Sequence, residues 1–208
     1  MADSLTWLLT STTYGTWLPG DARGFVGRVR EIRHGDDFAS ERVEHDRPGT
    51  EYDAGIPKLR EASISLMKGE PVWLTADLAI VVRDQFIETA AYRGWELHAA
   101  SVMSNHFHLV VTAKAEILTD AMLRDFKAYA SRALNCRRPK PASGTWWTSS
   151  GSRRRLPDDR ALDAAIAYVL NQHSPLAVYP EPSGGRQPPV SCLARAGEKH
   201  GGLTPPAR

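Results

Sequence analysis

Two histidines, one residue apart, are the side chains of this sequence whose type and spacing best suit metal binding. His106 and His108 enclose Phe107 near the end of an apolar run, Trp95 to Val111. Such a run predicts a buried strand, and alternation along a strand places both imidazoles on one face. Two neighbouring imidazoles can bind one divalent cation, because histidine is the commonest metal ligand. The pattern alone is weak, since two polar residues on a solvated sheet face have the same spacing.

A second stretch supplies a candidate nucleophile. The segment Tyr168-Val169-Leu170-Asn171-Gln172 continues a helical pattern that begins near Asp158. Residues four apart share a face of a helix, so Tyr168 and Gln172 are expected to point the same way. A separate apolar stripe on this helix suits packing on a sheet and consists of Leu162, Ile166 and Val169. The pattern predicts a helix that brings a tyrosine and an amide oxygen to one place.

Tyr129 is the competing nucleophile. It lies in another predicted helix, Leu118 to Cys136, and has Ala133 rather than an amide four residues on. A core or groove position fits Tyr129 better. For Tyr168 taken alone, an amphipathic tyrosine at a helix edge is the ordinary alternative, so its combination with the histidines carries the hypothesis.

Together, the two stretches resemble the motifs of the HUH single-tyrosine transposases, which include insertion-sequence transposases and their REP-associated relatives. Residues 104–108 are similar to the family's Pro-Asn-His-hydrophobic-His, with Ser104 in place of the proline. Residues 168–172 are similar to its helical Tyr-x-x-Asn-Gln. The resemblance covers residues 5–17, 75–114 and 117–173, and the first of these ranges is the least specific.

The resemblance implies an enzyme that cleaves and rejoins single-stranded DNA near hairpins. Tyr168 would attack a phosphodiester, release a 3′-hydroxyl and form a 5′-phosphotyrosine intermediate. His106, His108 and Gln172 would bind a divalent metal, Mg²⁺ or Mn²⁺, which polarises the phosphate. The resemblance also implies a ferredoxin-like fold. It leaves open whether Tyr168 completes its own site or that of a partner in a homodimer, as in insertion-sequence relatives.

Two other functions remain open at this point. A domesticated protein of the same fold would bind DNA hairpins with little turnover. A metal hydrolase would use water, with Tyr168 as a substrate contact. The intact set of Tyr168, His106, His108 and Gln172 favours the transposase or nickase. Labelled hairpin DNA and Mn²⁺ separate the three functions, because only tyrosine attack leaves DNA covalently bound to protein.

The formal net charge of the whole chain is only +2, which by itself does not indicate nucleic-acid binding. Any basic surface that contacts phosphate must therefore be local. The predicted DNA contacts are Lys127, Arg132, Arg137, Arg138, Lys140, Arg153, Arg154 and Arg155. Further candidates lie in a polar insertion: Arg23, Arg28, Arg30 and Arg33. Of Trp146 and Trp147, we expect one in the core and one available for stacking on bases. His98 and His173 are expected to be packed structural histidines.

The order of elements suits an α+β fold with helices mainly on one face, and it is compatible with the ferredoxin-like antiparallel sheet that the resemblance implies. Strands are expected at 5–14, 95–111 and 145–148, a basic turn at 149–155, and helices at 57–68, 76–93, 118–136 and from 158 onward. We expect one domain, residues 1–173, with an insertion at about 22–70. A Pro- and Gly-rich tail, residues 174–208, is expected to lack a core of its own.

Membrane insertion is not indicated. No apolar run is long enough to span a bilayer, and the N-terminus lacks a signal-peptide pattern. The two cysteines, Cys136 and Cys192, have no metal-binding spacing. We therefore expect a cytoplasmic protein without a membrane partner.

Overall fold

The computed structural model describes residues 4–23, 30–34, 40–44 and 54–181, with side chains except at 30–34 and 40–44. The strands are β1 Ser4–Thr12, β2 Arg30–His34, β3 Ser40–Glu44, β4 Glu96–Val102, β5 His106–Lys114, β6 Ser152–Leu156 and β7 Ala177–Tyr179. The helices are α1 Pro57–Ser65, α2 Ala76–Arg93, α3 Thr119–Asn135 and α4 Asp159–Leu170. Within the predicted insertion, β2 and β3 pair in a separate two-stranded sheet.

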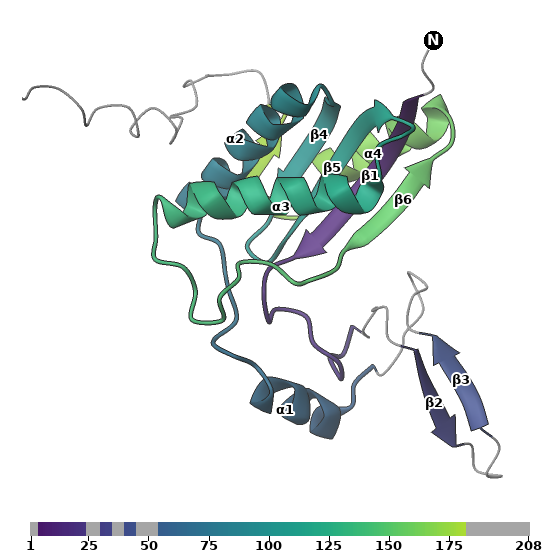
Figure 1. Ribbon diagram of the computed structural model, residues 1–208, viewed down its shortest axis with the longest axis vertical. Coiled ribbons are helices and arrows are strands. Elements are labelled where there is room, and N and C mark those ends of the chain that lie inside the picture. The colour runs from purple at the N-terminus through teal and green to yellow at the C-terminus, as the bar shows by residue number, and fades with distance from the viewer. Residues whose placement is uncertain (1–3, 24–29, 35–39, 45–53, 182–208) are drawn as a thin grey trace, which may run out of the picture.

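The other strands form one antiparallel sheet in the order β6-β1-β5-β4-β7 (Figure 1). Leaving the insertion aside, the chain runs β1-α2-β4-β5-α3-β6, so that a helix crosses over between strands twice. This βαββαβ connectivity is that of the ferredoxin-like fold. The predicted fold class is therefore confirmed, and β7 extends the sheet beyond β4.

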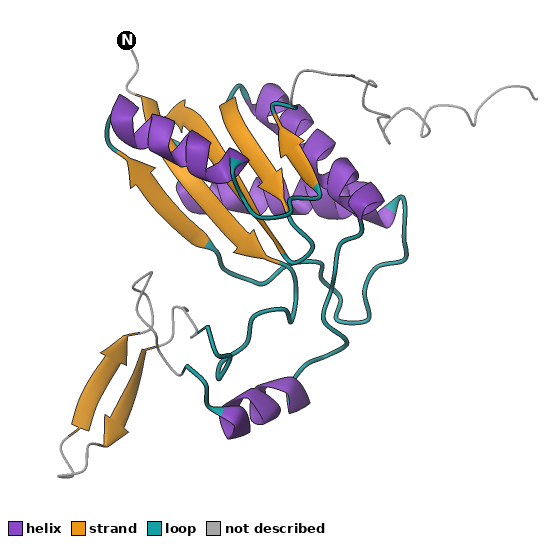
Figure 2. Ribbon diagram, turned by 180° about the vertical axis from the view of Figure 1, so that it is seen from behind, coloured by secondary structure: helices purple, strands orange, loops and turns teal. Residues whose placement is uncertain are grey.

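Helices cover both faces of the five-stranded sheet (Figures 1 and 2). α2 and α3 pack together on one face, where the ring centroid of Phe86 lies 4.8 Å from that of Phe107 and 5.5 Å from that of Phe126. Such aromatic pairs add about 0.5–1.5 kcal/mol each beyond the burial of their area. α4 lies on the other face, where Val169 packs in a smaller cluster with Val110 of β5. Most helical cover is thus on one side, and α4 stands alone on the other.

The prediction of a single strand at 95–111 is wrong, because this run folds into β4, a tight turn and β5. Ser104 and Asn105 occupy the turn, and the N–H of Met103 donates to the carbonyl of His106 across it at 2.8 Å. Helices cover both faces of the sheet, so the side chains of both strands are almost all apolar. The turn between the strands is therefore hard to recognise in the sequence. His106 therefore begins a strand instead of standing near the end of one.

The strand predicted at 145–148 and the turn predicted at 149–155 are also misplaced. Trp147 makes one bridge to Thr13, whereas the arginine-rich run 152–156 forms β6 at the edge of the sheet, beside β1. Charged side chains suit an edge strand, because they discourage pairing with another chain. The basic run is therefore a structural edge and not a turn.

Both Trp146 and Trp147 are buried, so the expectation that one is available for base stacking is wrong. The indole N–H of Trp146 donates to Oδ1 of Asn135 at 2.8 Å. That of Trp147 donates to Oγ of Ser131 at 3.1 Å. Strict alternation of side chains holds only within a regular strand, and this segment is not one.

Helix ends agree with their sequence signals. α2 begins after Thr75 and stops at Gly94, whose φ of 67° is left-handed. Asp158 caps α4, since its Oδ1 accepts from the N–H of Ala161 at 2.8 Å. None of the described helices combines the length and the apolar character that crossing a membrane requires.

The sheet continues past the predicted start of the tail at 174, because Ala177–Tyr179 forms β7 and pairs with β4. Residues 182–208, most of that predicted tail, lie outside the described residues. The division of the chain at 173 stays a prediction.

Candidate active site

His106 and His108 stand side by side on the face of the sheet that α4 partly covers. Their ring centroids are 5.0 Å apart, with the planes at 84°. In the antiparallel register His108 lies between Thr10 of β1 and Ser101 of β4. Residues opposite one another share a face of the sheet, so Thr10, His108 and Ser101 form a polar row on one face. Phe107 points to the other face, into the α2/α3 core. The predicted common face is confirmed.

Each imidazole has its Nδ1 atom held by a neighbouring oxygen. Nδ1 of His106 donates to Oδ1 of Asn105 at 2.6 Å, because an amide oxygen can only accept. Nδ1 of His108 hydrogen-bonds to the Thr10 hydroxyl, also at 2.6 Å. In both rings Nε2 is the nitrogen that takes no part in these bonds. Metal-binding histidines typically have one nitrogen oriented in this way by a second residue.

Burial keeps both histidines neutral near pH 7. It lowers the pKa of His108 to about 4, with a smaller contribution from the charge of His106. Burial also lowers the pKa of His106, helped by the positive charge of Arg23. A neutral imidazole is the form that binds a metal, so the environment suits a ligand role.

Tyr168 lies on α4, directly beside this pair. Its ring centroid is 5.2 Å from that of His108. Ala165 and Val169, on the buried side of α4, anchor the helix against the sheet. The tyrosine itself is 51% exposed, so a bulky substrate can reach the phenol oxygen. The sheet and α4 thus bring the two sequence motifs together, although they are far apart in the chain.

Gln172 lies just beyond the end of α4, since Asn171 is the C-cap. Its side-chain amide turns back and donates from Nε2 to the backbone carbonyl of Tyr168 at 2.8 Å. The carbonyl oxygen Oε1, the predicted metal ligand, takes no part in that bond. The structure therefore places Gln172 next to Tyr168 as expected, and its ligand role stays a prediction.

Tyr129 belongs to the opposite side of the sheet. It lies on α3, where its ring is 6.4 Å from that of Tyr92 and stacks under the guanidinium of Arg132 at 5.0 Å. α3 packs on the face that Phe107 points to, whereas the histidines point to the α4 face. This placement agrees with a groove residue and puts Tyr129 on the opposite side of the sheet from the two histidines.

Lys127 is not a surface cation, contrary to its predicted role as a phosphate contact. It is 9% exposed, and Nζ donates to the carbonyls of Thr148 at 2.7 Å and Ser150 at 2.6 Å. Burial lowers its pKa to about 8. Lys127 therefore ties α3 to the segment that leads into β6.

The arginines of β6 point in two directions. Arg154 is paired with Leu8 and so shares the α4 face with the histidines, whereas Arg153 is paired with Leu9 and forms an ion pair with Asp120 of α3. Arg155 is exposed and pairs with Trp7, on the same side as Arg153. Exposed basic residues at the end of α3 and after it form another group: Arg132, Arg137, Arg138 and Lys140. Of all these, Arg154 shares the face of the candidate active site.

Two further histidines were expected to be packed. His98 is partly buried and its Nε2 hydrogen-bonds to the Thr112 hydroxyl at 2.7 Å, in agreement with a structural role. His173 is exposed, so the expectation that it packs on the apolar stripe is wrong. It follows the end of α4, where the helical stripe no longer applies. Arg28 lies outside the described residues, as do the side chains of Arg30 and Arg33.

Of the two residues that hold the imidazoles, one can be recognised from the sequence and the other cannot. Asn105 stands inside the histidine motif and is visible as part of it. Thr10 is 98 positions from His108 and reaches it through the pairing of β1 with β5. Only the strand register identifies it.

The donor set suits a metal with mixed nitrogen and oxygen ligands. No group of three or more His, Cys, Asp or Glu side chains is placed for a metal among the described residues. A cation at His106 and His108 would therefore take its other ligands from an amide oxygen, water or phosphate. Such a set fits Mg²⁺ or Mn²⁺, of which Mn²⁺ suits imidazole better.

Two solved structures are similar to this chain at low identity. One is a REP-associated tyrosine transposase bound to a REP hairpin, with 11% identity and a TM-score of 0.40 over 79% of this chain and 63% of that one. This chain thus spans less than two thirds of that protein's length. The other is a protein from Deinococcus radiodurans to which a transposase function has been assigned, with 15% identity and a TM-score of 0.40 over 84% and 95% of the two chains. No curated protein is significantly similar in sequence.

The family model described as "Transposase IS200 like" matches residues 63–172, more than half of the 208 residues. The matched range contains α2 to α4, and with them His106, His108, Tyr168 and Gln172. This chain therefore belongs to the family of IS200-like transposases.

Proposed function

We propose that this chain is a metal-dependent transposase or nickase that cleaves and rejoins single-stranded DNA near hairpins. One observation carries the proposal. The Tyr168 ring lies 5.2 Å from that of His108, and His108 and His106 have their Nδ1 atoms engaged. A half-exposed phenol beside two oriented, neutral imidazoles is an arrangement suited to nucleophilic attack on a phosphate.

The proposed ligands of the metal are Nε2 of His106, Nε2 of His108 and Oε1 of Gln172. When bound there, Mg²⁺ or Mn²⁺ supplies Lewis acidity that draws electron density from the scissile phosphate. Thr10 and Asn105 hold the imidazoles in the required orientation. Nε2 of Gln172 donates to the backbone carbonyl of Tyr168, which leaves Oε1 of the same planar amide as an acceptor.

Tyr168 is the proposed nucleophile. Its Oη forms a bond to phosphorus while the bond from phosphorus to the 3′-oxygen breaks. The phenol proton passes to solvent, and the departing oxygen takes a proton to become a 3′-hydroxyl. In the reverse direction a 3′-hydroxyl attacks the phosphotyrosine and Tyr168 is released, so DNA is rejoined without an external energy source.

The proximity of Tyr168 and His108 within one chain supports a site completed by a single copy. The exposed arginines near α3 and on β6 support a DNA partner, because phosphate contacts supply much of the affinity. A hairpin is proposed as the DNA element on the strength of the family. A homodimer is compatible with this scheme and is not required by it.

The experiment uses a labelled DNA hairpin with randomised single-stranded flanks, incubated with the intact chain and Mn²⁺. The proposal predicts a covalent protein–DNA adduct on a denaturing gel, and peptide mapping that places the nucleotide on Tyr168. Tyr168→Phe keeps the ring but lacks the attacking oxygen, so it should bind DNA without forming the adduct. Tyr129→Phe is the matched control and should form the adduct normally.

Other outcomes assign the other functions. Binding without cleavage by the intact chain indicates a domesticated hairpin-binding protein. Cleavage without any adduct indicates attack by water. For the metal, His106→Ala combined with His108→Ala should abolish the adduct while hairpin binding largely survives. Full Mn²⁺-dependent cleavage by this double variant would refute the ligand assignment.

A further inference from the structure

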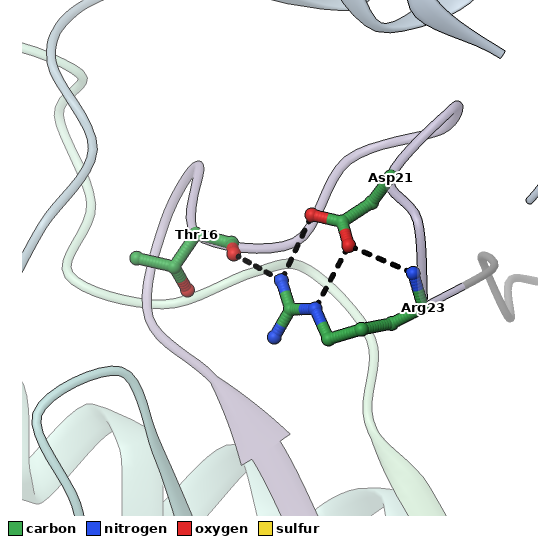
Figure 3. Close-up of polar contacts among 3 residues, drawn as sticks. All are labelled: Thr16, Asp21 and Arg23. Atoms are coloured by element: carbon green, nitrogen blue, oxygen red, sulfur yellow. Dashed lines mark hydrogen bonds and ion pairs between the residues drawn. The ribbon is translucent and has the colours of Figure 1, made fainter. Parts of the chain in front are cut away.

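The loop that follows β1 holds one arginine in a fixed position near the candidate active site. Nε and Nη2 of Arg23 donate to the two carboxylate oxygens of Asp21 at 2.8 and 2.9 Å, and Nη2 also donates to the carbonyl of Thr16 at 3.1 Å (Figure 3). The guanidinium lies over the Trp17 ring, 5.2 Å from its centroid. The third nitrogen, Nη1, takes part in none of these hydrogen bonds. A guanidinium with two of its three nitrogens held by hydrogen bonds is oriented to donate to one more acceptor.

Helix α1 and the residue before its N-cap hold this loop by hydrogen bonds. The N–H of Gly55, just before α1, donates to the carbonyl of Asp21 at 3.1 Å, and the Ser63 hydroxyl donates to the carbonyl of Pro19 at 3.3 Å. Gly20 has a φ of 84°, and a Cβ there would lie 2.5 Å from the backbone nitrogen of Arg60. Only glycine permits so close an approach of loop and helix. Residues of the predicted insertion therefore hold the loop through hydrogen bonds and close backbone packing.

A short chain of hydrogen bonds joins the loop to the histidine motif. Thr16, whose carbonyl accepts from Arg23, donates from its hydroxyl to the carbonyl of Asn105 at 3.3 Å. Asn105 in turn accepts from Nδ1 of His106. Arg23 is thus linked through Thr16 to Asn105, the residue that holds His106.

We propose that Arg23 binds the scissile phosphate through Nη1 and orients it for attack by Tyr168. The inference rests on the proposed function and names a further positioning residue for it. A guanidinium half exposed to solvent, at 52%, and clamped by a carboxylate offers a directed N–H to a phosphate oxygen at little further ordering cost. Asp21 serves as the clamp, because its hydrogen bonds to Arg23 lower its pKa to about 2 and keep it ionised.

The test begins with DNA recovered from the covalent adduct, whose sequence identifies the cleavage position. Single-turnover adduct formation is then measured for the intact chain, Arg23→Gln and Arg23→Lys. Arg23→Gln should slow adduct formation by roughly 100-fold, the typical effect of losing one directed donor to a reacting oxyanion. Arg23→Lys should recover only part of the rate, since an ammonium lacks the planar fork. Arg124→Gln, at an exposed arginine of α3, is the matched control and should leave the rate unchanged.

A binding measurement tests the contact without catalysis or metal. In Tyr168→Phe with a chelator present, replacing the scissile phosphate by a neutral methylphosphonate should weaken binding several-fold. In Tyr168→Phe combined with Arg23→Gln the same replacement should have no effect. An equal loss in both backgrounds would overturn the proposal, as would an unchanged adduct rate in Arg23→Gln.

A loss of fold is distinguished by thermal unfolding. If Arg23→Gln unfolds near the assay temperature, Arg23→Met, which keeps the length of the side chain without its charge, replaces it in the same binding measurement. A loss equal to that in Tyr168→Phe alone again overturns the proposal. If the intact chain forms no adduct, the proposed function itself fails and this inference falls with it. If the intact chain forms adduct and the Arg23 variants match it, only the role of Arg23 fails.

Discussion

Thr10 and Asn105 orient the two imidazoles, although neither is a proposed metal ligand. A hydroxyl held at 2.6 Å from Nδ1 of His108 fixes which nitrogen faces outward and how the ring is turned. The same holds for Asn105 and His106. Residues of this kind typically account for a 10–100-fold difference in metal affinity. The sequence identifies the ligand candidates more readily than these supports.

Thr10→Val removes the hydroxyl and keeps the shape of the side chain. We expect it to weaken Mn²⁺ binding by about 10–100-fold, measured by calorimetric titration. Thr6→Val is the matched control, because Thr6 lies on the same face of β1 but bonds to the Thr112 hydroxyl at 2.7 Å. Equal Mn²⁺ affinity in the Thr10 variant and the intact chain would contradict the orienting role.

Lys127 shows how a residue that looks like a DNA contact can serve the fold instead. Its two hydrogen bonds to backbone carbonyls hold the segment that leads into β6. Replacing it by methionine leaves the carbonyls of Thr148 and Ser150 without this donor. A cost of about 1–3 kcal/mol in the free energy of unfolding is expected from urea titration. A change within error would mean that water replaces the ammonium without loss.

The same lysine predicts a rise of stability with pH. Burial lowers its pKa from 10.5 to about 8 in the folded chain, so between these values the unfolded chain binds more protons and stability increases as pH rises. Between a pH above 10.5 and a pH below 8, the free energy of unfolding falls by about 3 kcal/mol from this group. Urea titrations at pH 7.5 and 10 should show this increase in the intact chain and a smaller one in Lys127→Met. An identical pH dependence in both would exclude Lys127 as its source.

At the scale of elements, β6 divides its arginines between two faces of the sheet. Arg154 shares the face of His108, whereas Arg153 pairs with Asp120 on the other side. Arg154→Gln should therefore reduce the slope of log affinity against log salt for single-stranded DNA by about 0.7, the value for one phosphate contact. Arg153→Gln is the control and should leave the slope nearly unchanged. The opposite ranking would show that DNA lies along the α3 side.

Sequence patterns located the helices better than the strands. Thr75, Gly94 and Asp158 mark helix ends locally, because the residue types that favour a helix terminus stand at that terminus in the chain. The turn at Ser104 was missed, since both strands of that hairpin are buried on both faces and carry no alternation. β6 was missed because an edge strand needs little apolar character. Long-range pairing, as between Thr10 and His108, depends on the register of whole strands.

At the scale of the whole molecule, one chain brings Tyr168 and the two proposed histidine ligands together. Its five-stranded sheet carries the histidines, and α4 of the same chain places Tyr168 beside them. An active site completed in cis follows if this arrangement persists on DNA. The fold class was predictable from element order and family motifs, whereas the proximity of Tyr168 to His108 within one chain is visible only in the structure.

Mixing two inactive variants tests the cis arrangement. Tyr168→Phe lacks the nucleophile, and His106→Ala combined with His108→Ala lacks the ligands. If each chain completes its own site, an equimolar mixture forms no adduct, as judged on the denaturing gel used for the intact chain. Recovery of adduct in the mixture would show that Tyr168 works in a partner's site.

The two edges of the five-stranded sheet also bear on how the chain meets its own copies. One edge is β6, whose sequence is Ser-Arg-Arg-Arg-Leu, and the other is β7, only three residues long. Positive charge on one border and brevity on the other both oppose pairing of the sheet with a second sheet. Among the described residues, helical surfaces therefore suit a contact between two copies better than the sheet edges do. The same two borders protect a largely apolar sheet from strand-to-strand aggregation while the chain is being made.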